Sequence, residues 1–406
     1  MENKWEPMAQ RSQQKRHFGH KDMDYYLSWI VGRQTYAGSD PAECLAAASR
    51  IADGDPQSWQ AEWAQLARRV EDQAHTALSA GDRLSARGAY LRACTYYRAP
   101  LFIMNPRDAA FREGWQKLQS CFRKAASLLD PPLEIIEVPF GGNMLRAYFW
   151  KVDDSGRKRP TLIVIGGMET FAEDCYFITG PAGPRRGYNV MTADLPGQGV
   201  NPDAGLFLEA RMEIPLKAVV DYALSRPEVD PDHLAVFGFS WGGHIVLKGA
   251  QHDPRIKALI ANPPMPDVFR AALAQQTAHG KGDPVGKRIF EQLAWRFGVG
   301  TGDILRRLVK GFEYLLFARA NCSAIRCPTL CMAGEGEAKV TLALARECHE
   351  QLPNPSGKLV ILTAEQGGEA HCQVNNLSLL NQVIFDWLDE VFHQGLRSCA
   401  AKEGVP

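Results

Sequence analysis

The chain has 406 residues, of which 45% are hydrophobic and 23% charged, a composition that excludes disordered, collagen-like and coiled-coil proteins. Its 46 basic residues balance 46 acidic residues, so no net charge favours binding to nucleic acid or to an anionic membrane. No segment approaches the roughly 18 consecutive apolar residues that span a bilayer. We therefore expect a cytoplasmic protein with a small-molecule partner, with a homodimer as the open alternative to a monomer.

The first 21 residues are polar and include five basic residues, with no apolar stretch behind them. This pattern differs from that of a secretory signal and predicts a frayed tail. The ten cysteines never form a C-x-x-C pair. We therefore expect reduced thiols, no disulfides and no metal site.

Residues 22–130 have the apolar periodicity of helices, interrupted by short turns. Asp40-Pro41-Ala42-Glu43 predicts a helix start, because an aspartate can cap the first amides and proline fits the first helical position. Apolar residues four and three apart between Phe111 and Leu129 predict a helix with one buried face. We expect an N-terminal helical domain over residues 1–130 that contributes to the substrate pocket.

After Pro131-Pro132 the pattern changes to strands. Gly141-Gly142-Asn143 predicts the turn of a hairpin. Short runs rich in Val, Ile and Leu then alternate with helix-length segments, as is typical of a parallel sheet covered on both faces. The runs are residues 161–165, 189–193, 233–237, 256–260, 329–333 and 358–362.

Residues 131–406 are thus expected to form an α/β domain with a mostly parallel, doubly wound sheet. Residues 263–323 contain no strand pattern, and they predict a helical lid over the C-terminal edge of the sheet, with helices near 268–276, 286–297 and 303–318.

A G-x-S-x-G motif, Gly238-Phe239-Ser240-Trp241-Gly242, lies between a predicted strand and a predicted helix. Glycines two positions before and after the serine allow the strand and helix to approach closely. This context predicts that Ser240 is a nucleophile exposed at the tip of a strand.

A serine nucleophile needs an imidazole base, which a carboxylate orients. His371 follows the last predicted strand in a loop, whereas His244, His349 and His393 fall within helices or at a helix end, so we expect His371 to be the base.

The acid is expected after the strand 329–333, where Glu335 and Glu337 compete. The usual Gly-x-x-Asp-x-x-Val spacing favours Glu337. Asp267, which follows the preceding strand, is the further alternative.

A tetrahedral intermediate needs two hydrogen-bond donors for its oxyanion. The backbone N–H groups of Trp241, next to the nucleophile, and of Met168, in the glycine-rich loop after strand 161–165, are the candidates. Glu169 is a candidate for substrate binding or for capping a turn. Tyr97 and Arg98, beside Tyr96, suit a flat oxygenated ligand, and the alternative is a packed helix with one surface arginine.

Taken together, these motifs resemble those of the α/β-hydrolases with an N-terminal helical domain, the group of 2,6-dihydropseudooxynicotine hydrolase and the fermentation/respiration switch esterase-like proteins. The chain is also similar to hydrolases of fungal polyketide gene clusters. The resemblance covers most of residues 131–392. The loop after strand 329–333 departs from the nicotine-degrading type, because it contains Glu335 and Glu337 where that type has an aspartate. The matching segments are Gly166-Gly167-Met168-Glu169, Asp194-Leu195-Pro196-Gly197-Gln198-Gly199, Gly238-Phe239-Ser240-Trp241-Gly242-Gly243 and Glu369-Ala370-His371-Cys372-Gln373.

The resemblance implies an enzyme that needs no cofactor and acts through an acyl-enzyme. It would hydrolyse an ester, thioester or amide, or cleave a carbon-carbon bond beside a ketone in a retro-Claisen reaction, on an aromatic or polyketide-like metabolite. The alternatives are a general carboxylesterase, a polyketide cyclase that transfers the acyl group within its substrate, and a catalytically silent binding protein on the same fold.

Overall fold

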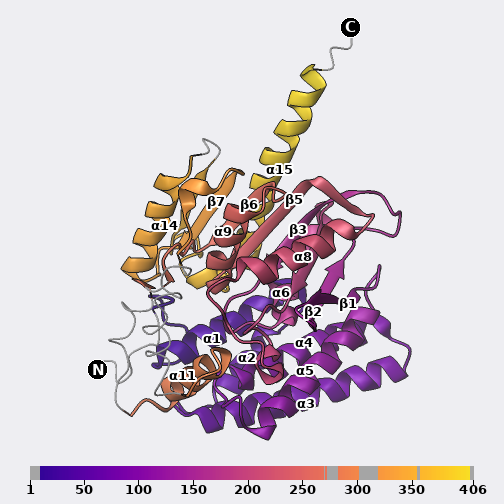
Figure 1. The fold of residues 1–406 in the computed structure, drawn as a ribbon. Coiled ribbons are helices and arrows are strands. Elements are labelled where there is room, and N and C mark those ends of the chain that lie inside the picture. Colours follow the sequence, from indigo (N-terminus) through magenta and orange to yellow (C-terminus); the bar gives the residue numbers. More distant parts are fainter. Residues whose placement is uncertain (1–9, 269, 272–281, 301–318, 354–356, 403–406) are drawn as a thin grey trace.

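The computed structural model describes residues 10–268, 270–271, 282–300, 319–353 and 357–402, the last ten of these by their backbone alone. An eight-stranded sheet forms the centre, in the order β1-β2-β4-β3-β5-β6-β7-β8 (Figure 1). The β1–β2 and β2–β4 pairs are antiparallel, and all other neighbours are parallel. The expected mostly parallel sheet is confirmed.

The strands coincide with the predicted apolar runs, with small differences at their ends. In β4, β6 and β7 every residue is buried, which explains why these strands read as continuous apolar runs. The strands are β1 Glu134–Phe140, β2 Asn143–Trp150, β3 Arg159–Ile165, β4 Asn189–Ala193, β5 Val229–Phe239, β6 Ala258–Asn262, β7 Thr329–Gly334 and β8 Lys358–Leu362.

Helices cover both faces of the sheet, as a doubly wound fold requires. In β3, Leu162 and Val164 belong to one hydrophobic core and Ile163 and Ile165 to another, because successive side chains point to opposite faces. The second core contains residues of α8 Glu213–Ser225, α9 Trp241–His252 and α14 Lys339–Gln351. The first contains residues of α6 Ala172–Ile178, α15 Leu377–Lys402 and the N-terminal helices.

The N-terminal helices form a layer below the sheet, coloured indigo to purple in Figure 1. Ring contacts connect this layer to the α/β half: Phe122 lies 5.0 Å from Tyr148 of β2, and Phe111 lies 5.6 Å from Trp295 between ring centroids. The predicted apolar stripe of the last helix therefore packs on the α/β half. The helices are α1 Lys21–Gly32, η1 Arg33–Tyr36, α2 Pro41–Ala48, α3 Pro56–Ser79, α4 Arg83–Leu101 and α5 Ala109–Ser127.

Helix α2 begins as predicted, with Asp40 as its cap and Pro41 as its first residue. The Asp40 carboxylate accepts hydrogen bonds from the amides of Ala42 and Glu43. The Asp40 amide, however, donates to the hydroxyl of Tyr96, which in turn donates to the Glu43 carboxylate. Tyr96 thus joins α4 to α2.

Between β6 and β7, in the segment predicted as a lid, the structure describes helix α11, Pro284–Arg296. The expected helix 303–318 and most of the expected helix 268–276 lie outside the described residues. The Gln292 side chain of α11 donates to the carbonyl oxygens of Leu101 and Phe102. The α11 helix therefore contacts the helical layer as well as the α/β half.

The prediction of a frayed tail is wrong for residues 10–20. The Asp24 carboxylate accepts hydrogen bonds from the amides of Arg16, His17 and Phe18, and the Arg11 carbonyl accepts one from the His371 amide. Residues 13–17 are exposed, as their polarity predicts, but these hydrogen bonds hold the backbone of the segment in place.

No helix in the described part of the chain has the length and apolar character needed to cross a membrane. The nine cysteines whose side chains are described carry free thiols.

Candidate active site

Ser240 lies in a tight turn between β5 and α9. Its φ angle is 56°, a strained value for a residue with a side chain. The flanking glycines are needed sterically: a Cβ on Gly238 would lie 2.1 Å from the Gly242 carbonyl oxygen, and one on Gly242 would lie 2.2 Å from that of Ile165. The Ser240 amide donates to the Asn262 carbonyl at 2.7 Å, which ties the turn to β6.

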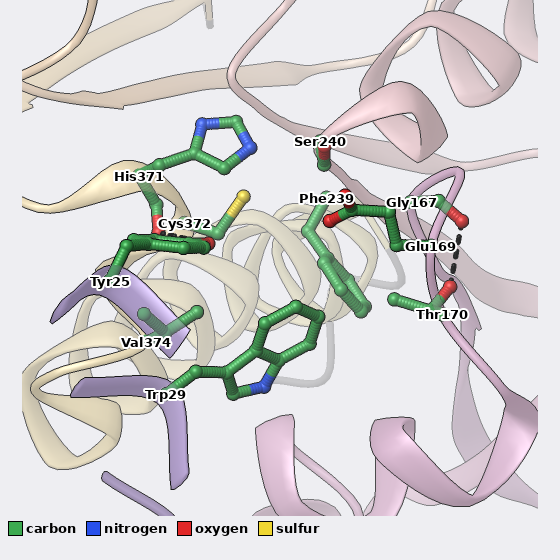
Figure 2. A pocket seen from close by; sticks show the side chains of 10 residues that line it. All are labelled: Tyr25, Trp29, Gly167, Glu169, Thr170, Phe239, Ser240, His371, Cys372 and Val374. Atoms are coloured by element: carbon green, nitrogen blue, oxygen red, sulfur yellow. Dashed lines mark hydrogen bonds between the residues drawn. The ribbon is translucent and has the colours of Figure 1, made fainter. Parts of the chain in front are cut away.

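His371 begins the short helix η5, His371–Gln373, after β8. Its Nδ1 lies 2.6 Å from Oε1 of Glu337, a carboxylate that is only 3% exposed in the loop after β7. A bond from Nδ1 to a carboxylate fixes the ring and leaves Nε2 for proton transfer. His371 and Ser240 line the same cavity and lie at the same end of it (Figure 2).

The other two candidate acids have different partners. Glu335 Oε1 accepts a hydrogen bond from the Ala364 amide at 2.6 Å, beyond the end of β8. Asp267 forms an ion pair with Arg319 at 3.0 Å and accepts a bond from the Arg270 amide. Among the described carboxylates, Glu337 alone is hydrogen-bonded to the His371 ring.

The electrostatic environment of His371 favours its protonated form. Burial by itself lowers the pKa of the imidazole, but its neighbours, the Glu337 carboxylate among them, outweigh this effect and raise the pKa well above its ordinary value. Burial raises the pKa of the Cys372 thiol, despite the opposing charge of His371. The imidazolium that forms after proton abstraction is therefore stabilised.

The cavity is lined by both halves of the molecule. Tyr25 and Trp29 of α1 provide aromatic surface, and Tyr25 lies beside His371 and Cys372 (Figure 2). The empty volume of the cavity is about 280 Å³, open solvent at its mouth included. The lining residues are Tyr25, Trp29, Gly167, Glu169, Thr170, Phe239, Ser240, His371, Cys372 and Val374.

The loop after β3 approaches the nucleophile closely. A Cβ on Gly167 would lie 2.7 Å from Cβ of Ser240. The Gln198 side chain holds this loop by donating to the carbonyl oxygens of Gly166 and Gly167. Met168, the candidate oxyanion donor, is the next residue of the loop, and Trp241, the other candidate, is the first residue of α9.

Glu169 lines the cavity and bonds to groups from the N-terminal part of the chain. Its Oε1 accepts hydrogen bonds from Arg11 Nη2 at 3.2 Å and from the Tyr26 hydroxyl at 2.9 Å. Burial alone raises the pKa of this carboxyl, but Arg11 and Tyr26 outweigh burial and lower it. Glu169 is therefore an ionised side chain at the edge of the cavity.

Tyr97 and Arg98, expected to contact the substrate, are not among the residues that line the cavity. The Tyr97 hydroxyl donates to Glu71 of α3 at 2.7 Å. Arg98 is 1% exposed and donates through Nε to Asp174 and through Nη2 to the Glu169 carbonyl at 2.7 Å. Consecutive residues of a helix point in different directions, so one faces the helical layer and the other the loop after β3.

Arg98 therefore contacts the candidate active site through the backbone of the loop after β3. Arg296 of α11 donates to the same Glu169 carbonyl at 3.3 Å and to the Gly197 carbonyl at 2.8 Å. Two buried arginines, Arg98 from the helical layer and Arg296 from α11, thus hold the carbonyl of Glu169, the residue that follows Met168.

Sequence reasoning missed the pocket residues Tyr25, Trp29, Cys372 and Val374. The spacing of Tyr25 and Trp29, four apart on one helix face, was a readable signal. That this face meets the active site depends on how the helical layer docks, which the spacing does not encode. Among the described residues, no group of three or more His, Cys, Asp or Glu side chains is arranged to hold a metal ion.

Comparisons with known proteins agree with this architecture. The family described as Esterase FrsA-like matches residues 34–303. The chain is 33% identical over 414 residues to Hydrolase ORFZ of Pyricularia oryzae, covering 91% of this chain and 96% of the relative. It is 29% identical to 20-hydroxy-prefusarin hydrolase FUS2 of Gibberella moniliformis, covering 89% and 94% of the two chains.

The fold has a solved counterpart in the crystal structure of 2,6-dihydroxy-pseudo-oxynicotine hydrolase. The TM-score is 0.71 with 23% sequence identity, over 88% of this chain and 95% of that one. At this identity the likeness shows the fold alone, and the family match and the first relative carry the assignment. The chain is an α/β-hydrolase and belongs to the FrsA-like esterase family.

Proposed function

We propose that the protein is a serine hydrolase in which Ser240 is the nucleophile, His371 the general base and Glu337 the acid of the triad. The observation that carries the proposal is the 2.6 Å contact between His371 Nδ1 and Glu337 Oε1, beside a cavity that Ser240 and His371 both line. The α/β domain, residues 131–406, would carry the triad. The helical domain, residues 1–130, would close the cavity.

In the first half of the reaction, Ser240 Oγ adds to the substrate carbonyl carbon while His371 Nε2 takes the hydroxyl proton. Glu337 stabilises the imidazolium that forms. The oxyanion is bound by the backbone N–H groups of Met168 and Trp241. The intermediate then expels the leaving group, which receives the proton from His371, and the acyl group remains on Ser240.

In the second half, His371 takes a proton from water, whose oxygen adds to the acyl carbon. The second intermediate expels Ser240, to which His371 returns the proton, and the carboxylic acid leaves. The net reaction adds one water across the cleaved bond. The leaving group is an alcohol or thiol in an ester or thioester, or a carbon atom in a retro-Claisen cleavage, where the expelled carbanion must be stabilised by a neighbouring carbonyl or aromatic ring.

We further propose an aromatic or polyketide-like secondary metabolite as the substrate. The rings of Tyr25, Trp29 and Phe239 provide flat apolar surface on the cavity wall, and Glu169 provides a carboxylate that accepts a hydrogen bond from a substrate hydroxyl or amide. One relative is named as a hydrolase of 20-hydroxy-prefusarin, and this supports the substrate class.

The nucleophile is tested with a fluorophosphonate probe, which bonds covalently to activated serines. We expect labelling of the unmodified chain on the peptide that contains Ser240, located by mass spectrometry, and none in Ser240→Ala. Ser225→Ala is the matched control, because Ser225 lies exposed at the end of α8. Equal labelling of Ser240→Ala and the unmodified chain would refute the assignment.

The substrate class is tested by comparing p-nitrophenyl acetate with candidate polyketide esters and 1,3-diketones, with products followed by mass spectrometry. Fast turnover of the acetate without preference for the larger compounds would favour a general carboxylesterase. A product of unchanged mass with a new ring would favour a cyclase. Absence of both labelling and turnover would favour a silent binding protein.

A further inference from the structure

The N-terminal segment, residues 11–18, lies against the loops that carry His371 and Glu337. Its central contact is Glu369, a carboxylate two residues before His371 that is 1% exposed. Glu369 accepts hydrogen bonds from Ser12 Oγ at 2.8 Å, the Gln13 amide at 3.2 Å and Arg16 Nη2 at 3.1 Å. All three donors belong to the N-terminal segment.

Backbone bonds extend this contact to the catalytic residues. The His371 amide donates to the Arg11 carbonyl at 2.7 Å, and the Glu369 carbonyl accepts a bond from the Gly336 amide, which precedes Glu337, at 3.0 Å. Space at this junction is tight, since a Cβ on Gly336 would lie 2.1 Å from Glu369 Oε2 and 3.3 Å from the Gln13 nitrogen. Three segments far apart in sequence therefore meet at Glu369.

The N-terminal segment is also attached at the other side of the cavity. The Arg11 side chain donates to Glu169, and its guanidinium lies 4.9 Å from the centre of the Tyr25 ring. Both partners line the cavity. The segment thus extends from the loop that carries His371 to the loop that carries the candidate oxyanion donor Met168.

We propose that residues 11–18 form part of the active site and that Glu369, together with Ser12 and Arg16, positions His371 for catalysis. This role rests on the proposed function, because it requires His371 to be the base. A buried carboxylate without partners is unfavourable. The three donors from the segment therefore stabilise the position of Glu369 and, with it, the position of the loop that carries His371. Glu369 acts through the backbone of the loop and does not exchange protons with the substrate.

The test uses the full-length double variant Ser12→Ala/Arg16→Met, which removes two of the three donors to Glu369. We expect the rate of Ser240 labelling by the fluorophosphonate and kcat on a p-nitrophenyl ester to fall by about tenfold to a hundredfold, since small displacements of catalytic groups have effects of this size. KM should stay within about twofold, because these residues do not line the cavity.

Two further variants separate positioning from general destabilisation. Arg50→Met removes a surface ion pair with Glu62 elsewhere in the helical layer and should leave the labelling rate unchanged. Glu369→Gln keeps the size of the side chain but removes its charge, and it should lower kcat in the same direction as the double variant. Restoring a cation in Ser12→Ala/Arg16→Lys should recover part of the lost kcat.

If the double variant and Glu369→Gln are both labelled at the rate of the unmodified chain, the positioning role is refuted while the proposed function stands. A parallel loss of kcat and thermal stability in Arg50→Met would also refute it, since any lost ion pair would then suffice. Absence of labelling at Ser240 in the unmodified chain would overturn the proposed function and the positioning role together.

Discussion

The two walls of the cavity are built in different ways. On the sheet side, each candidate catalytic group lies in a short motif at a strand end, such as the turn around Ser240, in which Gly238 packs against the carbonyl of Gly242 four positions later. On the helical side, the contacts join residues that are about 70 or more positions apart: Tyr26 to Glu169, Arg98 to Glu169 and Arg11 to His371. The comparison shows that the candidate catalytic groups depend on backbone geometry at the strand ends. The helical wall of the cavity depends on how the helical layer packs against the α/β half.

The largest effect is expected on the sheet side, for Ser240→Ala. Activity should fall by at least about three orders of magnitude, because only binding and the oxyanion donors would remain. Thermal stability should hardly change, as alanine occupies the same strained backbone position. Steady-state kinetics with a thermal melt check both statements, and activity within tenfold of the unmodified enzyme would contradict the assignment.

Glu337→Gln should come next, with a loss of about two to four orders of magnitude in kcat, since an amide favours the wrong tautomer of His371. Glu335→Gln and Asp267→Asn are the matched controls and should each cost far less, because these carboxylates bond to Ala364 and Arg319 instead. Measuring kcat for all three variants gives the ranking. If Asp267→Asn were inactive and Glu337→Gln active, Asp267, which follows β6, would be assigned as the acid of the triad instead of Glu337.

Arg98→Met tests the helical side, and Arg33→Met is its control. Both arginines pair with the buried Asp174, so both variants should lose up to about 3–5 kcal/mol in the free energy of unfolding, less where the remaining arginine compensates. Arg98 also holds the Glu169 carbonyl next to Met168, so kcat of the folded fraction should fall by roughly tenfold in Arg98→Met alone. Equal kcat values in the two variants would remove Arg98 from the active site.

The pH dependence should reflect the raised pKa of His371. The base must be neutral to accept a proton, and a raised pKa keeps a larger share of it protonated at neutral pH, so kcat/KM should increase as the pH rises through and above neutrality. A profile of kcat/KM against pH is the measurement. An acid limb at or below the ordinary histidine value of about 6.5 would show that the neighbours of His371 do not outweigh burial.

The smallest effect is expected for Tyr97→Phe. The hydroxyl donates to Glu71 within the helical layer, so its loss should cost about 1 kcal/mol of stability and leave kcat and KM unchanged. Chemical denaturation and steady-state kinetics test this directly. A raised KM for the natural substrate would show that Tyr97 contributes to substrate binding.

Much of the α/β half was predictable from the sequence. Strands β4, β6 and β7 are buried along their whole length, so their apolar runs stand out, and β4 and β8 coincide with the predicted ranges. The turn around Ser240 was equally visible in the sequence, because a positive φ at Ser240 between closely packed segments requires glycines at fixed spacing. In the loop after β7, the spacing between Gly334 and Val340 favoured Glu337, the carboxylate that bonds to His371 in the structure.

The sequence by itself determined which segments become strands and helices and which residues can react, because periodicity and backbone strain act over a few neighbouring positions. The tertiary structure alone decided the partners of the long polar side chains. In the folded protein, Tyr97 bonds to Glu71, Arg98 bonds to the loop after β3, and the N-terminal segment bonds to Glu369. The physical reason is that a buried charge must find an opposite charge or a hydrogen-bond partner, and the identity of that partner is set by packing rather than by position along the chain.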